Sequence, residues 1–227
     1  MISILLTARE NSKYLAKFIT TFVAHTKTRD VELLIFIPPA DTWNKELFEC
    51  FKDKIRIIPD NTGMGRGAGH IFYSELAKEA KGEWLWYVCD DHYLFDGYDE
   101  YILSYIQEHN LDSKKINVIA PFVSNSGRIS HILSRKVVEL VGFGQHGNVD
   151  SYINEMLEYL EVLTGERRLP YVPSIPVMSD FSLDKELMHT KNKADFNPIA
   201  QVQLFKSELM KEKIRNDARK LWEVTKK

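Results

Sequence analysis

The stretch KGEWLWYVCDD, residues 81–91, decides the fold that the sequence predicts. Its apolar part, WLWYVC at residues 84–89, is short and rich in aromatic side chains, and polar residues bound it on both sides. Such a run is typical of a buried β-strand. Asp90 and Asp91 then stand at the carboxyl end of the strand, where an open α/β sheet usually binds its ligand.

The segments before this strand alternate between strands and helices. Apolar runs predict strands at residues 2–6, 31–37 and 55–58, and helical spacing predicts helices at residues 12–25, around 47–51 and around 71–77. A Gly-rich loop at residues 63–69 leads into the last of these helices. This alternation predicts an α/β protein with a doubly wound, mainly parallel sheet flanked by helices.

The segments after residue 98 are less regular. We expect a helix to about residue 109, strands at residues 118–123 and 129–134, and helices at residues 135–141 and from Asp150 onward. Pro173 and Pro176 place any strand across residues 171–178 at an edge of the sheet. Residues 179–198 are irregular and polar, and a long helix from about Ile199 closes the chain.

The composition is that of an ordinary globular protein, with 44% hydrophobic and 27% charged residues and a net charge of −2. This balance argues against a surface generally coated by nucleic acid. The sequence has no apolar run of about eighteen residues that would predict a transmembrane helix, and residues 1–6 lack the basic leader of a signal peptide. Cys50 and Cys89 show no spacing of a disulfide framework or a zinc site, so we expect a protein of the reducing cytoplasm.

Positive charge is concentrated toward the C-terminal end. Residues 206–227 hold eight Lys or Arg and four Asp or Glu, which gives +4 there and leaves −6 for the rest of the chain. An amphipathic helix in this tail would partly bury Leu209, Ile214, Leu221 and Trp222. Its basic side chains either touch a polyanion or an anionic membrane surface, or form a solvated helix face.

The Asp90–Asp91 pair has two interpretations. Adjacent carboxylates repel each other unless a cation stands between them, and Mg²⁺ is commonly held by one or two carboxylates together with substrate phosphates. The alternative is that Asp90, Asp91 and His92 begin a solvated loop, because Asp is a common loop residue.

Several motifs occur in the order of a known family. They are a polar turn after the first strand, an Asn-x-Gly and a basic Gly-rich helix entry after the third, and an Ala-x-Gly-Glu sequence before the fourth: Thr7–Glu10, Asn61–Gly63, Arg66–Gly69 and Ala80–Glu83. Together with Asp90–Asp91 they resemble the GT-A glycosyltransferases, specifically those like family 2, over about residues 2–160. The resemblance implies a catalytic domain at residues 1–178. Residues 1–98 form its nucleotide-sugar half, residues 99–178 its acceptor half, and residues 179–227 an irregular segment and a basic helix packed on it.

The function implied by this resemblance is metal-dependent transfer of a sugar, with inversion, from a nucleotide-sugar donor to an acceptor hydroxyl. Asp91 would bind Mn²⁺ or Mg²⁺ directly, and His189 in the C-terminal segment would be a further metal ligand. The residues implied in donor and nucleotide binding are Thr7, Arg9, Glu10, Asp41, Asn61, Gly63, Arg66 and Asp90. The acceptor is open among a glycan, a lipid carrier, a protein and a modified nucleobase.

The base that deprotonates the acceptor is expected near a helix start that follows a Gly-rich loop. Residues 141–150 resemble that region and make Asp150 the expected base, with Glu155 as a less favoured substitute. The alternative for Asp150 is a helix N-cap, a position where Asp is preferred. His92, beside the Asp pair, is expected to support the metal ligands without binding the metal itself, and His131 and His146 are expected to line the acceptor pocket.

Two departures from the family pattern keep other functions open. Cys89 stands where the family has the first Asp of its Asp-x-Asp motif, and Pro38–Asp41 stands where acidic residues usually read the base. Both support a non-catalytic nucleotide- or glycan-binding module of the same fold. A nucleotidyltransferase is a further alternative because of the GMGRG sequence at residues 63–67, although its comparable loop follows the first strand rather than the third.

Overall fold

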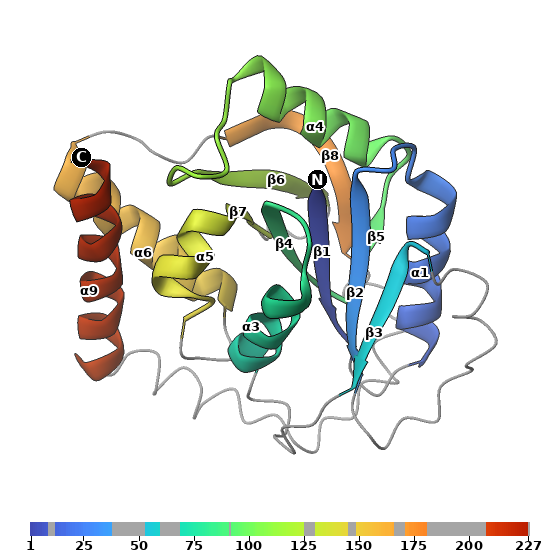
Figure 1. Ribbon diagram of the computed structural model, residues 1–227, viewed down its shortest axis with the longest axis horizontal. Coiled ribbons are helices and arrows are strands. Elements are labelled where there is room, and N and C mark those ends of the chain that lie inside the picture. Colours follow the sequence, from blue (N-terminus) through green and yellow to red (C-terminus); the bar gives the residue numbers. More distant parts are fainter. Residues whose placement is uncertain are drawn as a thin grey trace.

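The computed structural model describes residues 1–8, 12–37, 53–59, 69–90, 92–124, 130–144, 149–165, 171–180 and 208–226, with the backbone alone for residues 12–13, 122–124 and 171–180. In these ranges a central sheet is covered by helices on both faces, and the C-terminal helix lies at the opposite end of the molecule from the first one (Figure 1).

The helices and strands follow in this order: β1 (Ile2–Thr7), α1 (Ser12–His25), β2 (Val31–Ile37), β3 (Ile55–Pro59), α3 (Gly69–Glu79), β4 (Trp84–Cys89), β5 (His92–Leu94), α4 (Tyr98–Glu108), β6 (Val118–Ser124), β7 (Ile132–Ser134), α5 (Arg135–Val141), α6 (Val149–Thr164), β8 (Tyr171–Asp180) and α9 (Glu208–Thr225). The helix expected around residues 47–51 and the start of the last helix at Ile199 lie outside the described residues.

The strand order in the sheet is β3-β2-β1-β4-β7-β6-β8-β5. Strand β1 pairs in parallel with β2 and β4, and β2 pairs in parallel with β3. Strand β7 is antiparallel to both β4 and β6, β6 is parallel to β8, and β5 is antiparallel to β8. The predicted doubly wound, mainly parallel α/β sheet with a C-terminal helix is therefore confirmed, and β1 to β4 end at one common edge.

The prediction that residues 171–178 form an edge strand is wrong, because β8 lies between β6 and β5. The three-residue strand β5 pairs only with Met178–Asp180. Among the described residues, β6 is therefore the only strand paired with β8 at Pro173 and Pro176, and the β6 pairing shifts register in this stretch. A proline has no backbone N–H and cannot donate a hydrogen bond to a neighbouring strand. At Pro173 and Pro176 no such donor is needed toward β5, because β5 pairs with β8 only beyond them.

Strand β4 divides the core because its side chains alternate between the two faces of the sheet. Trp84, Trp86 and Val88 pack in one hydrophobic cluster with residues of α1 and α4. Leu85 and Tyr87 pack in the other, with residues of α3, α5, α6 and α9. The aromatic run that predicted a buried strand is thus covered on both faces.

The Ala80–Glu83 motif joins the amino ends of β1, β2 and β4. Glu32, which is buried, accepts hydrogen bonds from Ser3 Oγ at 2.6 Å and from the Lys81 N–H at 2.5 Å. The Gly82 N–H donates to Ser3 Oγ at 2.7 Å, and a Cβ on Gly82 would lie 2.5 Å from that oxygen. This motif therefore has a structural role at the edge of the sheet opposite to the carboxyl ends of the strands.

Helix α9 packs on α5 and α6 through Met210, Ile214, Ala218 and Leu221, all of which are buried. The expected burial of Ile214 and Leu221 is confirmed, but Leu209 is 80% exposed and that expectation is wrong. Successive residues are about 100° apart around a helix, and Met210 takes the inward position instead. No helix in the described parts of the chain is long and apolar enough to cross a membrane.

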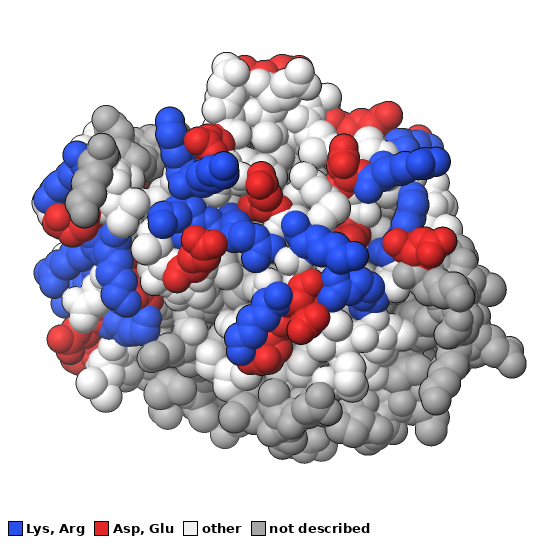
Figure 2. All heavy atoms as spheres, in the orientation of Figure 1, with Lys and Arg blue, Asp and Glu red and all other residues white. Residues whose placement is uncertain are grey.

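The surface of α9 mixes positive and negative charge. Residues 208–226 hold six Lys or Arg and four Asp or Glu, a net charge of +2, and Figure 2 shows both signs together over α9. Lys211 pairs with Glu208 at 2.8 Å, and Lys226 pairs with Glu223 at 2.9 Å. These pairings agree with the interpretation of the tail as a solvated helix face.

Candidate functional site

The carboxyl end of β4 carries the polar residues that the sequence singled out. Asp90 is only 2% exposed, and Cys89 before it is half-buried. The buried imidazole of His92 has its Nδ1 atom 3.3 Å from the Cys89 backbone nitrogen and 3.2 Å from the Cys89 carbonyl oxygen. The turn after β4 is thus closed by His92. Asp91 lies outside the described residues.

A chain of hydroxyl groups connects the carboxyl ends of β1 and β4. Thr7 Oγ1 donates to Tyr73 Oη at 3.2 Å, and Tyr73 Oη donates to the Val88 carbonyl at 2.8 Å. The same phenol oxygen lies 3.9 Å from Cys89 Sγ. Tyr73 of α3 is therefore part of the floor of the site, and it fixes the hydroxyl of Thr7 beside Cys89, its partner in the strand register.

Tyr87 and His131 form a buried polar pair on the same face of the sheet. Tyr87 Oη lies 2.7 Å from His131 Nδ1. Burial lowers the pKa of His131 to about 4, against a smaller raising contribution from the Asn154 side chain, so the imidazole is neutral at pH 7. Within the described parts of the chain, His131 Nε2 has no hydrogen-bonding partner. Because His131 has no exposed surface, the expectation that it lines an acceptor pocket is wrong.

Asp150 lies in the first turn of α6 and is half-exposed. Burial raises the pKa of Tyr87 well above its usual value, and the charge of Asp150 raises it further. Asp150 therefore favours the protonated, hydrogen-bond-donating form of this phenol. A carboxylate in the first turn also lies where a helix stabilises negative charge.

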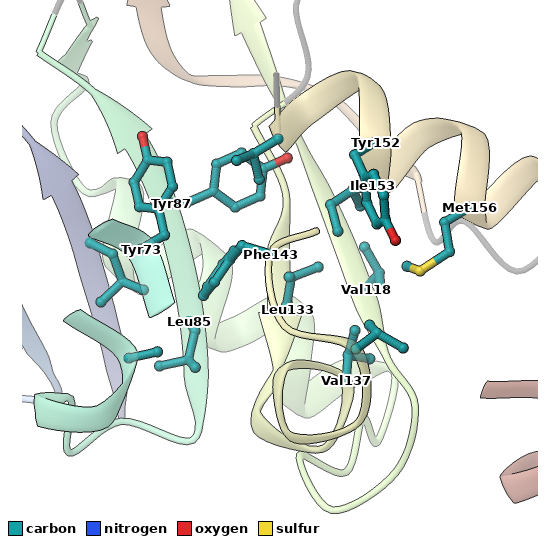
Figure 3. Close-up of a cluster of buried hydrophobic side chains, with 14 of the residues drawn as sticks. Tyr73, Leu85, Tyr87, Val118, Leu133, Val137, Phe143, Tyr152, Ile153 and Met156 are labelled. Atoms are coloured by element: carbon teal, nitrogen blue, oxygen red, sulfur yellow. The ribbon is translucent and has the colours of Figure 1, made fainter. Parts of the chain in front are cut away.

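Buried side chains around Tyr87 lie between the sheet and α6 (Figure 3). The Phe143 ring lies 5.6 Å from the Tyr73 ring and 5.9 Å from the Tyr87 ring, measured between centroids. Tyr152 and Ile153 of α6 belong to the same buried cluster. Glu155, the less favoured base, is an exposed residue of α6. Its pKa is raised, first by partial loss of hydration and then by the charge of Glu158.

Two of the predicted site residues, Thr7 and Asp90, thus lie at the carboxyl ends of β1 and β4. Asp150 lies in the first turn of α6, and its charge raises the pKa of Tyr87 in β4. The others lie outside the described residues: Arg9, Glu10, Asp41, Asn61, Gly63, Arg66, Asp91, His146 and His189. The described part of the chain contains no group of three or more His, Cys, Asp or Glu side chains placed to hold a metal ion.

Sequence reasoning missed Tyr73 and Tyr87 as parts of the site. A tyrosine inside an apolar helix face or strand was a usable signal, because a buried phenol needs a hydrogen-bonding partner. Their partners, however, lie 15 to 66 residues away along the chain.

No protein-family model and no curated protein sequence matches this chain. Solved structures do match it. S. aureus TarS, residues 1–349, in complex with UDP-GlcNAc is 14% identical and has a TM-score of 0.64, and the match covers 94% of this chain and 70% of that one. The mannosyltransferase PcManGT from Pyrobaculum calidifontis, in complex with GDP-Man and Mn²⁺, is 11% identical and has a TM-score of 0.61, with 99% and 75% covered.

These matches define the class of the fold. The chain has a GT-A-like α/β fold, and it is structurally similar to nucleotide-sugar glycosyltransferases over nearly its whole length. The resemblance inferred from the motifs is thereby confirmed at the level of the fold.

Proposed function

We propose that this protein is a metal-dependent glycosyltransferase that moves a sugar from a nucleotide-sugar donor to an acceptor hydroxyl with inversion. The observation that carries the proposal is the GT-A-like fold with a buried carboxylate, Asp90, directly after β4. A second carboxylate, Asp150, lies in the first turn of α6, and its charge raises the pKa of Tyr87 of β4. One carboxylate then belongs to the donor side and the other to the acceptor side.

The residues at the end of β4 suit a hard divalent cation. Asp90 supplies a carboxylate at a buried position, where an ionised group needs a compensating charge or hydrogen bonds. We assign the metal to Asp91, with Asp90 beside it and His189 as a further ligand, and Mn²⁺ or Mg²⁺ as the ion. When bound, such an ion neutralises the negative charge of a diphosphate leaving group. PcManGT, which shares the fold, was solved with Mn²⁺.

The donor is a nucleoside diphosphate sugar in this proposal, as are UDP-GlcNAc and GDP-Man in the two matched structures. Arg66 places a positive charge near the diphosphate, and Gly63 lets the backbone approach it closely. Thr7, Arg9, Glu10, Asp41 and Asn61 complete the nucleotide side.

Asp150 takes the proton from the acceptor hydroxyl as that oxygen attacks the anomeric carbon. A general base must lie within hydrogen-bonding reach of the proton it removes, directly or through one water. The partial exposure of Asp150 leaves it accessible to an acceptor. Inversion follows if the acceptor oxygen displaces the nucleoside diphosphate in a single step.

The test begins with a panel of nucleotide sugars screened by thermal shift with and without Mn²⁺, because a ligand that binds only the native state raises its stability. Turnover of the donor so identified is then compared between wild type and Asp150→Asn. We expect unchanged nucleotide affinity and a loss of turnover of about 10²–10⁴ in the variant.

Normal turnover in Asp150→Asn would remove Asp150 from the mechanism, and net retention at the anomeric carbon would exclude single displacement. Binding of a nucleotide without any turnover would favour the alternative of a non-catalytic binding module, for which Cys89 in place of the first motif Asp is the supporting observation.

A further inference from the structure

Asp217 makes a polar contact between the C-terminal helix α9 and helix α6. This carboxylate of α9 is fully buried, and Tyr152 Oη of α6 donates a hydrogen bond to it at 2.5 Å. Lys213 and Lys220 also pair with it, Lys220 at 3.1 Å. A buried charge is tolerated only when it is paired and hydrogen-bonded, and Asp217 meets both conditions.

The other side of Tyr152 is held by the chain just before α6. Gly144 has a φ of +85°, and a Cβ built on it would lie 2.7 Å from the Tyr152 ring. The ring of Tyr152 therefore packs directly on the Gly144 backbone, where only glycine leaves room. Burial, followed by Asp217, raises the pKa of Tyr152, so its hydroxyl stays protonated and acts as a donor. Tyr152 is fixed at its ring by Gly144 and at its hydroxyl by Asp217.

Tyr152 is two residues from Asp150 on the same helix. Two residues correspond to about 200° around the axis and about 3 Å along it, so the two side chains leave α6 on nearly opposite sides. Any rotation or slide of the first turn that displaces Tyr152 must displace Asp150 by a comparable amount. Fixing the phenol therefore fixes where the carboxylate points.

We propose that Asp217 is a positioning residue of the acceptor side. Through Tyr152 it sets the rotation and axial position of the first turn of α6, and thereby the place of Asp150 in that turn. The proposal rests on the proposed function only in taking Asp150 as the base. In this proposal the C-terminal helix α9 helps to position a catalytic residue of the acceptor half.

The test uses the full chain with Tyr152→Phe and Asp217→Asn, each of which removes one side of the contact and keeps the shape of the side chain. Met210→Ala is the control, because Met210 is a buried residue of the same helix outside the polar contact. All three variants are assayed well below their unfolding temperatures, and Asp150→Asn is assayed alongside them.

We expect Tyr152→Phe and Asp217→Asn to lower kcat by about tenfold or more, because small displacements of a catalytic group are costly, and to leave nucleotide affinity unchanged. The double variant should lose no more than the worse single variant, since both act through one contact. Met210→Ala should keep kcat within about twofold at a similar loss of thermal stability. A wild-type kcat in both polar variants, or an equal loss in Met210→Ala, would reduce Asp217 to a structural residue.

Amide hydrogen exchange gives a readout that does not depend on catalysis. Exchange at residues 153–156, whose N–H groups bond to the carbonyls of the first turn of α6, should accelerate in Tyr152→Phe and Asp217→Asn and not in Met210→Ala. Unchanged exchange there would overturn the positioning role even if Asp150 proves to be the base. Accelerated exchange together with normal turnover in Asp150→Asn would instead overturn the role of Asp150 as the base. It would still support the inference that Asp217 fixes the first turn of α6 through Tyr152.

Discussion

Lowering the pH should destabilise the native protein through His131, by an amount that its burial determines. The pKa of His131 is about 4 in the folded protein against an ordinary value of 6.5. The folded state therefore binds fewer protons than the unfolded state between these two values, and stability falls as the pH drops from about 6.5 to about 4. A difference of this size corresponds to about 3 kcal/mol of unfolding free energy.

The cost arises because a protonated imidazole has two N–H donors and a charge to accommodate. Nδ1 faces the Tyr87 hydroxyl, whereas no described group meets Nε2 with good hydrogen-bonding geometry, and the Asn154 side chain offsets only part of the cost of burial. His131 has no exposed surface, so water cannot supply one without an opening of the structure. The neutral imidazole avoids both penalties.

The assay is urea unfolding at pH values from 7 to 4, comparing wild type with His131→Gln, which does not titrate. At pH 7 the variant should be less stable by about 1–3 kcal/mol, because Tyr87 loses a good partner. That difference should shrink or reverse by pH 4, since only wild type carries the linked loss of about 3 kcal/mol. Carboxylates such as Glu155 titrate in both proteins and cancel in the difference. Parallel pH profiles for the two proteins would refute the assignment.

Three further results are expected. Gly82→Ala should destabilise the protein by about 1–3 kcal/mol in urea unfolding, because its Cβ would lie 2.5 Å from Ser3 Oγ and 2.6 Å from the Ser3 backbone nitrogen; full stability would mean that β1 can move away. Tyr73→Phe should cost about 1–2 kcal/mol by the same method, since the Val88 carbonyl loses its side-chain donor, and no loss would imply a replacement partner. Asp91→Ala should abolish Mn²⁺-dependent nucleotide binding in titration calorimetry and leave the circular dichroism spectrum unchanged, whereas an unaltered affinity would contradict the metal assignment.

The sheet could be predicted because its pattern is local. Each of β1 to β4 is an apolar run bounded by polar or turn residues. Helix α1 connects β1 to β2 and α3 connects β3 to β4, and such alternation of strand and helix predicts parallel pairing. The position of β8 was not predictable in this way. It depends on a three-residue strand, β5, that pairs with it across more than 80 residues of chain, and no periodicity within residues 171–180 encodes that partner.

The site was predictable only in part for the same reason. The motif order predicts Asp90 and Asp150 as site residues, and the structure places Asp90 directly after β4 and Asp150 in the first turn of α6. The contacts that hold them there join residues far apart in the chain, as Tyr87 does with His131 and Tyr152 with Asp217. A sequence states that a tyrosine is present but not which distant group satisfies its hydroxyl. The assignments of Arg66, Asp91 and His189 stay predictions.

The placement of β1 between β2 and β4 has a consequence for biosynthesis. Ile2 pairs with Val31 on one side and with Trp84 on the other, 29 and 82 residues further along the chain. At about 5–20 residues per second, translation needs about 4–16 s to reach Trp84 after Ile2 has been made. Throughout that time the apolar sequence ISILL has backbone N–H and C=O groups that lack their partners in β4. Chaperones bind apolar segments of this kind. We therefore expect the yield of folded protein in a cell-free translation system to fall when holdase chaperones are depleted, and to recover when they are restored.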